Sequence, residues 1–260
     1  MNRLLLAGTL ALVSGITGVM AQKQPQAKSQ KELDAIKLMF GAQDPDARIK
    51  AADELITKFA DTEFKTLAMY LMAASYEQKN DFEKMVFWCE QTVRADPKHY
   101  ACLLMMAGGI VKRARENDLD LTEKLTRSDS YAKSALEALK DAPKPNPALP
   151  DDQWAATKKD YVSQAHEAYA LAAALRKKYD VAIGEFKQAI EGAATPDPAT
   201  MVRLGQAYNQ AGKYDDAIAI LDKLMADANV NPQIRQFAQA ERVRAIQGKG
   251  GPAKPAEAKK

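Results

Sequence analysis

In the C-terminal half of this chain, a pattern of small and aromatic residues occurs twice with a spacing of 35 residues. Repeats of this length are typical of stacked helix pairs, in which no pair can bury its apolar face alone. Such a stack exposes an extended surface, so the repeat indicates a binding role more directly than a chemical reaction. The first copy contains Ala170, Tyr179, Ala182 and Phe186, and the second contains Gly205, Tyr214, Ala217 and Leu221 at the corresponding positions.

The composition favours an all-α fold. Aromatic residues make up only 7% of the 260 residues, and the chain is rich in the helix formers Ala, Lys, Leu, Glu and Gln. Apolar residues recur at helical intervals from Leu33 to Ile246. We therefore predict that residues 31–247 form one right-handed superhelical solenoid of antiparallel helix pairs. Its last helix, over 232–247, is expected to cap the final apolar face.

The repeat register is interrupted once. Ala107 and Ala170 occupy equivalent positions but lie 63 residues apart, which is one repeat plus about 29 residues. The intervening sequence contains four prolines between 143 and 150, and a long helix is expected to end before them, near Lys140. We predict an insertion at about 115–150 within a continuous solenoid, because the repeat resumes after it.

The first 21 residues have the features of a secretory signal peptide. Arg3 precedes a largely apolar run, and the small residues around Ala21 suit cleavage by a signal peptidase. An uncleaved membrane anchor is the alternative, since about 17 apolar residues can just cross a bilayer. We predict a secreted or periplasmic protein that is cleaved after Ala21 and is not stably inserted in the membrane thereafter.

Two further terminal segments, 22–30 and 248–260, are predicted to be a disordered linker and a disordered basic tail, because they are poor in apolar residues. Of the net charge of +3, Arg3 contributes +1 and residues 22–31 and 249–260 contribute +3 each, which leaves residues 32–248 near −4. The basic character therefore belongs to the ends, and we expect no nucleic-acid partner for the folded part.

The second copy of the repeat belongs to a longer motif, with LGQAY at 204–208 followed by Tyr214, Ala217 and Leu221. This motif resembles the tetratricopeptide repeat family. The segment FADTEF at 59–64, before a predicted helix, also looks like envelope-associated repeat proteins, so the chain resembles secreted or periplasmic bacterial-type members of the family. The resemblance is most specific over 163–229 and weaker earlier in the chain. In this pattern, small residues let two antiparallel helices approach and aromatic residues fill the space between pairs.

The resemblance implies that a protein or peptide segment lies in a concave groove lined by the first helix of each pair. Family members that clamp a ligand's carboxylate need lysine, arginine and asparagine at several groove positions, and this chain departs from that pattern. The groove is therefore expected to be mixed and partly apolar, and suited to an extended or helical protein segment. Our candidate groove residues are Tyr70, Leu104, Glu167, Leu171, Val202, Gln206 and Asn209.

The sequence offers few groups for catalysis. Only two histidines are present, His99 and His166, and we expect both to be structural. No spacing of His, Cys and Asp suggests a metal site, and there is neither a glycine-rich phosphate loop nor a serine nucleophile motif. We predict no enzymatic activity, no catalytic residue, no metal and no cofactor.

These observations favour a non-catalytic scaffold or adaptor in the periplasm or cell envelope. A second hypothesis is a cell-wall or outer-membrane assembly component that binds glycan. A third is a thiol redox helper that uses Cys89 and Cys102, although no CxxC motif is present. An oxidising compartment permits a disulfide between these cysteines, and the alternative is two small apolar side chains in neighbouring helices.

Overall fold

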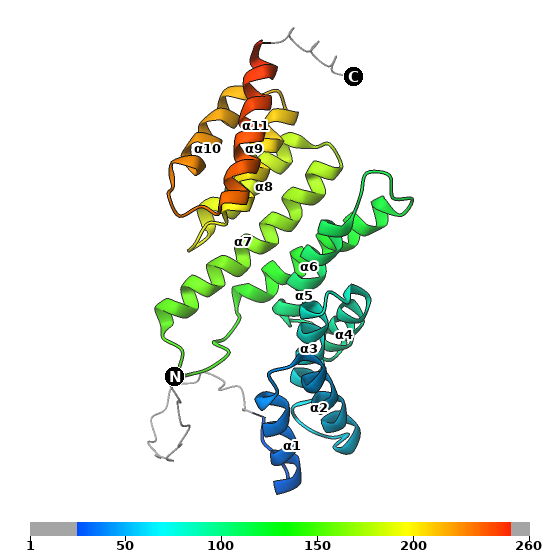
Figure 1. The fold of residues 1–260 in the computed structure, drawn as a ribbon. Coiled ribbons are helices and arrows are strands. Elements are labelled where there is room, and N and C mark those ends of the chain that lie inside the picture. Colours follow the sequence, from blue (N-terminus) through cyan, green and yellow to red (C-terminus); the bar gives the residue numbers. More distant parts are fainter. Residues whose placement is uncertain (1–24, 251–260) are drawn as a thin grey trace.

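The computed structural model describes residues 25–250, and within them the chain forms eleven helices and no strand (Figure 1). The predicted signal peptide, 1–21, lies outside the described residues, as do 22–24 and 251–260. None of the described helices is both long and apolar enough to cross a membrane. The helices are α1 (Gln30–Gly41), α2 (Pro45–Lys58), α3 (Lys65–Gln78), α4 (Phe82–Ala95), α5 (Tyr100–Arg113), α6 (Leu121–Lys140), α7 (Asp151–Leu175), α8 (Tyr179–Gly192), α9 (Pro198–Gln210), α10 (Tyr214–Ala226) and α11 (Pro232–Gly250).

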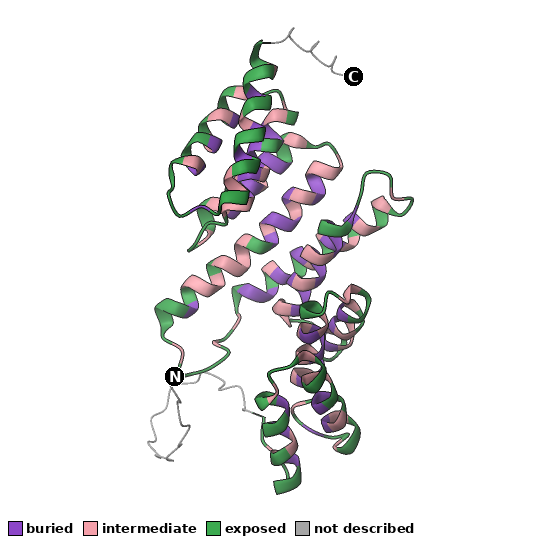
Figure 2. Ribbon diagram, viewed as in Figure 1, coloured by how far each residue is buried: buried purple, intermediate pink, exposed green. Residues whose placement is uncertain are grey.

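The helices pack as successive antiparallel hairpins along one solenoid. α3 packs on α4, α5 on α6, α7 on α8 and α9 on α10, and each hairpin contacts the next. Figure 1 shows α1 at one end, α11 at the opposite end and the long helix α7 across the middle. Buried residues follow the face of each helix that meets its neighbours (Figure 2), as expected for amphipathic helices. The predicted fold class, an all-α superhelical solenoid of helix pairs with a C-terminal capping helix, is confirmed.

Aspartate side chains cap the starts of several helices. Asp44, Asp81 and Asp197 accept hydrogen bonds from backbone amides in the first turn of α2, α4 and α9. Pro45 and Pro198 follow two of these caps, at the first helical position, where the missing amide of proline has no intrahelical partner to lose. These caps let the chain start a new helix within a few residues of the previous one.

Three of the turns inside a helix pair share one backbone conformation. Asn80, Lys177 and Gly212 have φ angles of 56°, 59° and 73°, and each lies just after the end of a first helix. In all three turns, the residue after this left-handed position donates its backbone amide to the carbonyl of the residue five positions before it, at 2.9 Å. The same turn therefore joins the two helices of the pairs α3–α4, α7–α8 and α9–α10.

The pair α5–α6 has a different turn, and here the predicted insertion takes a specific form. α6 packs on α5 as the second helix of the pair, and it has 20 residues where α4 and α8 have 14. The following first helix, α7, has 25 residues where α9 has 13. The extra residues are thus distributed over α6, its flanking loops and the N-terminal part of α7, and they do not form a separate element. α6 ends at Lys140, as predicted.

Alanines occupy close contacts between helices. Ala182 of α8 and Ala217 of α10, which are equivalent in the repeat, are both fully buried in one core that also contains Phe186 and Tyr208. A methyl group takes little space, so these positions let neighbouring helices approach closely. The prediction that both alanines are buried is confirmed.

The described parts of both ends pack against the solenoid. Lys28 Nζ lies 2.7 Å from Asp61 Oδ2, and Ala27 contacts the apolar cluster of α1, α2 and α3. At the other end, α11 continues to Gly250, beyond the predicted limit of 247. The packed part of the chain therefore starts before residue 31 and ends after residue 247.

Candidate binding groove

The first helices of four consecutive pairs, α3, α5, α7 and α9, line a groove that contains two cavities, and we call it the first-helix groove. Cavity A has a volume of about 540 Å³ and is bounded by α3, α5, α7 and the start of α9. Cavity B has a volume of about 360 Å³ and is bounded mainly by α7, α9 and α11. The lining of cavity A includes Tyr70, Glu77, Leu104, Gly108, Lys112, Arg113, Asp160, Tyr161, Gln164, Glu167 and Asp197. The lining of cavity B includes Leu171, Leu175, Phe186, Arg203, Gln206, Gln210, Glu241 and Arg244.

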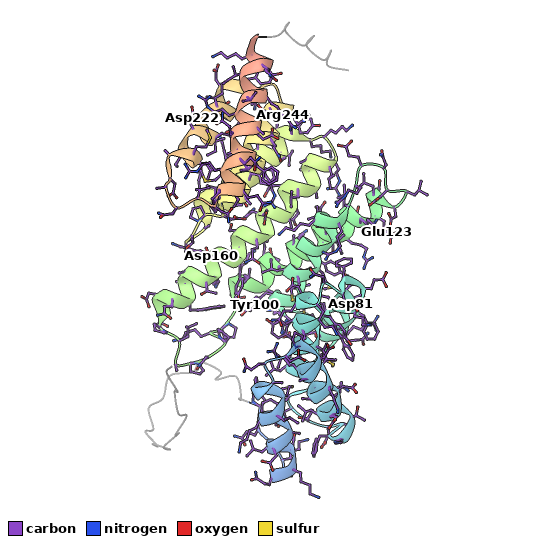
Figure 3. The ribbon with its side chains drawn as sticks, in the orientation of Figure 1. Asp81, Tyr100, Glu123, Asp160, Asp222 and Arg244 are labelled. Carbon is purple, nitrogen blue, oxygen red and sulfur yellow. The ribbon has the colours of Figure 1, made fainter. Side chains whose placement is uncertain are left out.

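Aromatic rings form one wall of cavity A. The ring centroid of Tyr70 lies 4.8 Å from that of His99, and the centroid of Tyr161 lies 5.3 Å from that of Tyr100, which Figure 3 labels. Trp154, near the start of α7, lies 6.2 Å from Tyr100 and extends the cluster. Burial raises the pKa of Tyr70 and raises the pKa of Tyr100 to about 12, so both phenols are neutral at physiological pH. Of these rings, those of Tyr70 and Tyr161 line cavity A and give it an aromatic wall.

Acidic side chains dominate the charged lining of cavity A. Asp160 Oδ1 accepts hydrogen bonds from the amides of Ala194 and Thr195, at 2.8 and 3.1 Å, and so ties α7 to the loop before α9. Glu77 stands exposed at the end of α3. Within residues 25–250, neither Glu77 nor Asp160 forms an ion pair, whereas the other two carboxylates of the cavity both approach Arg203.

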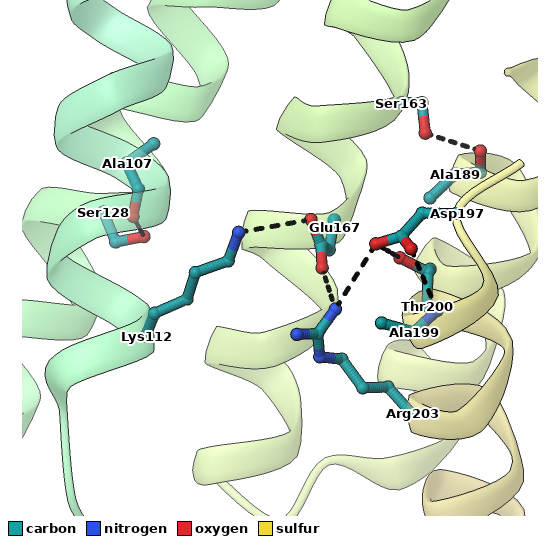
Figure 4. A network of polar contacts seen from close by, with 10 residues as sticks. All are labelled: Ala107, Lys112, Ser128, Ser163, Glu167, Ala189, Asp197, Ala199, Thr200 and Arg203. Atoms are coloured by element: carbon teal, nitrogen blue, oxygen red, sulfur yellow. Dashed lines mark hydrogen bonds and ion pairs between the residues drawn. The ribbon is translucent and has the colours of Figure 1, made fainter. Parts of the chain in front are cut away.

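A buried carboxylate separates the two cavities. Glu167 of α7 is 8% exposed and pairs with Arg203 of α9, while its second oxygen lies 3.6 Å from Lys112 Nζ of α5 (Figure 4). Arg203 also approaches Asp197, with 3.9 Å between Nη1 and Oδ2. Glu167 lines cavity A and Arg203 lines cavity B. This bridge across three first helices therefore divides the groove.

The capping helix α11 closes one side of cavity B. Glu241 of α11 is buried and accepts hydrogen bonds from Gln206 Nε2 at 3.1 Å and from Arg244 Nη1 at 2.6 Å. Asn209 Nδ2 donates to the backbone carbonyl of Glu241 at 2.9 Å. Leu171 contributes to the apolar part of the cavity. Cavity B therefore combines an apolar floor with a polar rim that α11 helps to hold in place.

Most of the predicted groove residues lie in the first-helix groove. Two of the seven, Val202 and Asn209, line neither cavity, and Asn209 instead holds α11. Those that do line a cavity are Tyr70, Leu104 and Glu167 in cavity A and Leu171 and Gln206 in cavity B.

Val202 lies in the core instead of the groove. It is 6% exposed and packs in a cluster with Leu221 and Leu224 of α10 and Ala238 of α11. The reason is that α11 packs on both α9 and α10, as α7 packs on α5 and α6, and Ala238 of α11 lies in the same apolar cluster as Val202. Our placement of Val202 among the groove residues is not supported by this packing.

Asp160 and Tyr161 are cavity residues that the sequence analysis did not identify. The candidate groove residues on this helix began at Glu167, about two helical turns later. Because α7 is longer than the other first helices, the groove extends toward its N-terminus. Continuing the helical period backwards from Glu167 gives Gln164, and a further three and four residues give Tyr161 and Asp160.

The groups considered for chemistry have structural contacts. His99 Nδ1 accepts a hydrogen bond from the Cys102 amide at 3.4 Å as the cap of α5, and His166 Nδ1 lies 2.8 Å from Glu185 Oε2. Within residues 25–250, no group of three or more His, Cys, Asp or Glu side chains is placed to hold a metal ion.

Cys89 and Cys102 are free thiols and are fully buried in the same core. The neighbouring Cys89 thiol lowers the pKa of Cys102, and the Cys102 thiol, together with burial, raises the pKa of Cys89. The two sulfurs are therefore neighbours across the α4–α5 contact.

Comparison with known proteins agrees with this geometry. Models of the tetratricopeptide repeat match residues 167–240 and residues 67–99. A search of curated proteins gives no match. Among solved structures, the chain is similar to a thermophilic tetratricopeptide repeat protein of Thermus thermophilus, with 17% identity and a TM-score of 0.53 over 82% of this chain and 99% of that one. It is also similar to PilW, described as a widely conserved type IV pilus biogenesis factor, with 16% identity and a TM-score of 0.54 over 85% and 92%.

Both structural likenesses concern the fold, because the identities are low. The two matched segments contain the three turns that share a left-handed residue, which join α3 to α4, α7 to α8 and α9 to α10. The pair α5–α6, with its different turn and longer second helix, falls between them. Over residues 67–99 and 167–240 the chain therefore matches the tetratricopeptide repeat, and the two solved structures have the same type of helical fold.

Proposed function

We propose that this chain is a non-catalytic scaffold that binds a segment of a partner protein in the first-helix groove. One observation carries the proposal: four consecutive first helices contribute side chains to one groove that contains two cavities. Tetratricopeptide repeats stack into extended concave surfaces of this kind, and such surfaces are used for binding proteins.

An extended or helical segment suits the groove better than a small ligand does. The cavities lie on either side of the bridge formed by Lys112, Glu167 and Arg203, so one continuous segment can place side chains in both. Cavity A offers aromatic and acidic contacts, whereas cavity B offers an apolar floor that includes Leu171 and Phe186. The two cavities therefore select different side chains along one partner.

We place this function in the periplasm or cell envelope. The proposal rests on the signal peptide predicted over 1–21, and PilW, a protein of similar fold, is described as a pilus biogenesis factor. Fractionation of cells that express the full chain, followed by N-terminal sequencing, tests the location. We expect a periplasmic or secreted protein that begins at Gln22. A cytoplasmic protein that retains Arg3 would overturn this part of the proposal.

Glycan binding is the second candidate, because cavity A combines the rings of Tyr70 and Tyr161 with the polar side chains of Asp160 and Gln164. The thiol redox hypothesis has less support, since both cysteine side chains are fully buried and an external disulfide has no direct access to them.

Site-specific photo-crosslinking tests the groove directly. Gln164 of cavity A and Gln210 of cavity B are exposed, and Gln188 of the second helix α8 is an exposed control outside both cavities. Each is replaced singly by p-benzoylphenylalanine in cells that express the protein. We expect the same protein partner to be crosslinked from Gln164 and Gln210 but not from Gln188. Crosslinking from Gln188 alone would place the interaction on the convex side, and recovery of wall glycan without protein would favour the second candidate.

A further inference from the structure

We infer that cavity A binds a positively charged side chain, so that the partner segment is basic. This inference rests on the proposed function, because it specifies the chemistry of a segment bound in the first-helix groove. It is carried by the charges that line the cavity, by what each charge already contacts and by the aromatic wall beside them.

The lining of cavity A carries four carboxylates and two cations. Glu167 is neutralised within the protein, because it pairs with Arg203 and lies 3.6 Å from Lys112 Nζ. Asp197 caps α9 and lies 3.9 Å from the same Arg203. Glu77 and Asp160 remain as the two carboxylates of the cavity that form no ion pair within the described residues.

Both cations of the cavity are already engaged. Lys112 is directed to Glu167, and Arg113 lies over the ring of Phe82, with 4.4 Å between Cζ and the ring centroid. Arg113 Nη1 also donates to the backbone carbonyl of Gly109 at 3.3 Å. An acidic ligand would have to displace these contacts, whereas a basic ligand finds the carboxylate of Glu77 and the second oxygen of Asp160, Oδ2, available. The charge of about −4 carried by residues 32–248 acts in the same direction over a longer range.

The aromatic wall adds a second attraction for the same type of group. Tyr70 and Tyr161 line the cavity, and the faces of aromatic rings attract lysine and arginine side chains. A guanidinium group can stack on a tyrosine ring while it donates hydrogen bonds to a carboxylate at its edge. Arginine is therefore the side chain that uses both features of cavity A at once.

A glycine leaves room for such a side chain. A Cβ added to Gly108 would meet only Lys112 Nζ, at 4.0 Å, and would otherwise stand in open space. Gly108 lines cavity A, so a large side chain at this position fills the cavity without displacing the core. This position provides a variant that blocks the cavity sterically and leaves its charges unchanged.

Binding of three fluorescent peptide probes tests the inference. The probes share the sequence GSAXAXASG, with arginine, glutamine or glutamate at both X positions, and binding to the mature chain is followed by anisotropy at low and at physiological salt. We expect the arginine probe to bind about tenfold more tightly than the glutamine probe, and the glutamate probe to bind most weakly. Equal binding of the arginine and glutamine probes, tighter binding of the glutamate probe or no binding of any probe would each overturn the inference.

Charge variants locate the effect. Glu77→Gln and Asp160→Asn remove the charges and keep the shape, and Asp160→Asn retains an oxygen for the amides of Ala194 and Thr195. Each variant is expected to bind the arginine probe about three- to fivefold more weakly and to bind the glutamine probe with unchanged affinity. Glu191→Gln, on the exposed part of α8, is the matched control and should change neither. Loss of arginine binding in this control to the same degree would assign the preference to overall charge.

The variant Gly108→Phe separates this inference from the proposed function. If a partner occupies the groove, Gly108→Phe reduces crosslinking from Gln164 whatever the charge of the partner. Crosslinking that depends on Gly108 but is unaffected by Glu77→Gln and Asp160→Asn would retain the groove and refute the basic partner. If Gly108→Phe does not change crosslinking from Gln164, the proposal that the partner binds in the first-helix groove is refuted.

Discussion

Gly205 of α9 lies so close to Leu221 of α10 that a Cβ added to the glycine would stand 2.8 Å from Leu221 Cγ. Real Cβ atoms are not found at this distance, so a larger side chain at 205 has to move the leucine. Gly184 of α8 is the opposite case, because a Cβ added there meets no atom within 4 Å. The two glycines lie in the neighbouring helices α8 and α9, which belong to consecutive pairs, and only Gly205 is required by packing.

This contrast predicts opposite effects of the same substitution. Gly205→Ala gains about 1 kcal/mol from helix propensity but loses about 1–3 kcal/mol from overpacking against Leu221, so we expect a net destabilisation of about 1 kcal/mol. Gly184→Ala should gain the propensity term alone and stabilise by up to about 1 kcal/mol. Urea unfolding of both variants measures the two effects. A Gly205→Ala protein as stable as Gly184→Ala would mean that α9 and α10 are not in close contact.

Ala217 provides a second packing test, because it is fully buried in the core shared with Ala182 and Phe186. Ala217→Leu inserts a larger side chain into this contact and is expected to cost about 1–3 kcal/mol. Ala219, two residues later on α10, is exposed, so Ala219→Leu is a control that should change stability by less than about 0.5 kcal/mol. The comparison is made by thermal unfolding, and equal melting temperatures for the two variants would contradict the helix packing.

The bridge between the cavities should contribute to stability. Glu167→Gln removes the charge that faces Lys112 and Arg203, and leaves Arg203, which is partly buried, without its main partner. We expect a cost of about 1–3 kcal/mol, measured by urea unfolding. Arg203→Met in the same background should restore part of the loss, because it removes the unpaired cation. A double variant whose loss is the sum of the two single losses would show that the residues do not interact.

Lys177 is held in a conformation that favours glycine, with a φ of 59°. Lys177→Gly relieves about 1–2 kcal/mol of backbone strain and loses about 0.4–1 kcal/mol through the more flexible unfolded chain. The ion pair with Glu116, at 3.6 Å between exposed side chains, adds little. We therefore expect a stabilisation of about 0.5–1 kcal/mol. Arg176→Gly, one residue earlier where φ is −81°, should instead destabilise, and the order of the two melting temperatures tests the turn.

Because the thiols of Cys89 and Cys102 are neighbours, we expect their oxidation state to depend on the cellular compartment of the protein. Both are fully buried, so neither should react with a thiol reagent until the protein unfolds. We expect two free thiols per unfolded chain from a cytoplasmic preparation and none from protein exported to an oxidising compartment. A disulfide would close a short loop and raise stability by about 2–3 kcal/mol if its geometry is unstrained. Two free thiols in the exported protein would show that the packing of α4 on α5 forbids the bond.

Much of the fold could be predicted from the sequence. The spacing between the two copies of the repeat, with Ala182 and Ala217 at equivalent positions, predicted helix pairs in contact at these alanines. Lys140 was also predicted as the end of a long helix, because a proline-rich segment follows it. The helix end at Lys140 is a local feature, because proline leaves a direct signal there, and the helix pairing is visible because the same short pattern of residues occurs twice.

The candidate groove could be predicted only in part. Tyr70, Leu104 and Glu167 were expected to line it and do, because their positions follow from the helical period alone. Val202 of α9 occupies the equivalent position in its repeat, but α11 packs over α9 and α10, and Val202 is buried in the cluster that they form.

The sequence by itself thus determined the helices, their pairing and the small residues at their contacts. Only the tertiary structure decided that α6 completes a pair, that Asp160 and Tyr161 reach cavity A and that Glu167 joins Lys112 to Arg203 across three helices. The physical reason is the range of the interactions. Periodicity fixes which side of a helix is apolar, whereas the length of α7 and the packing of α11 determine which side chains from distant parts of the chain meet.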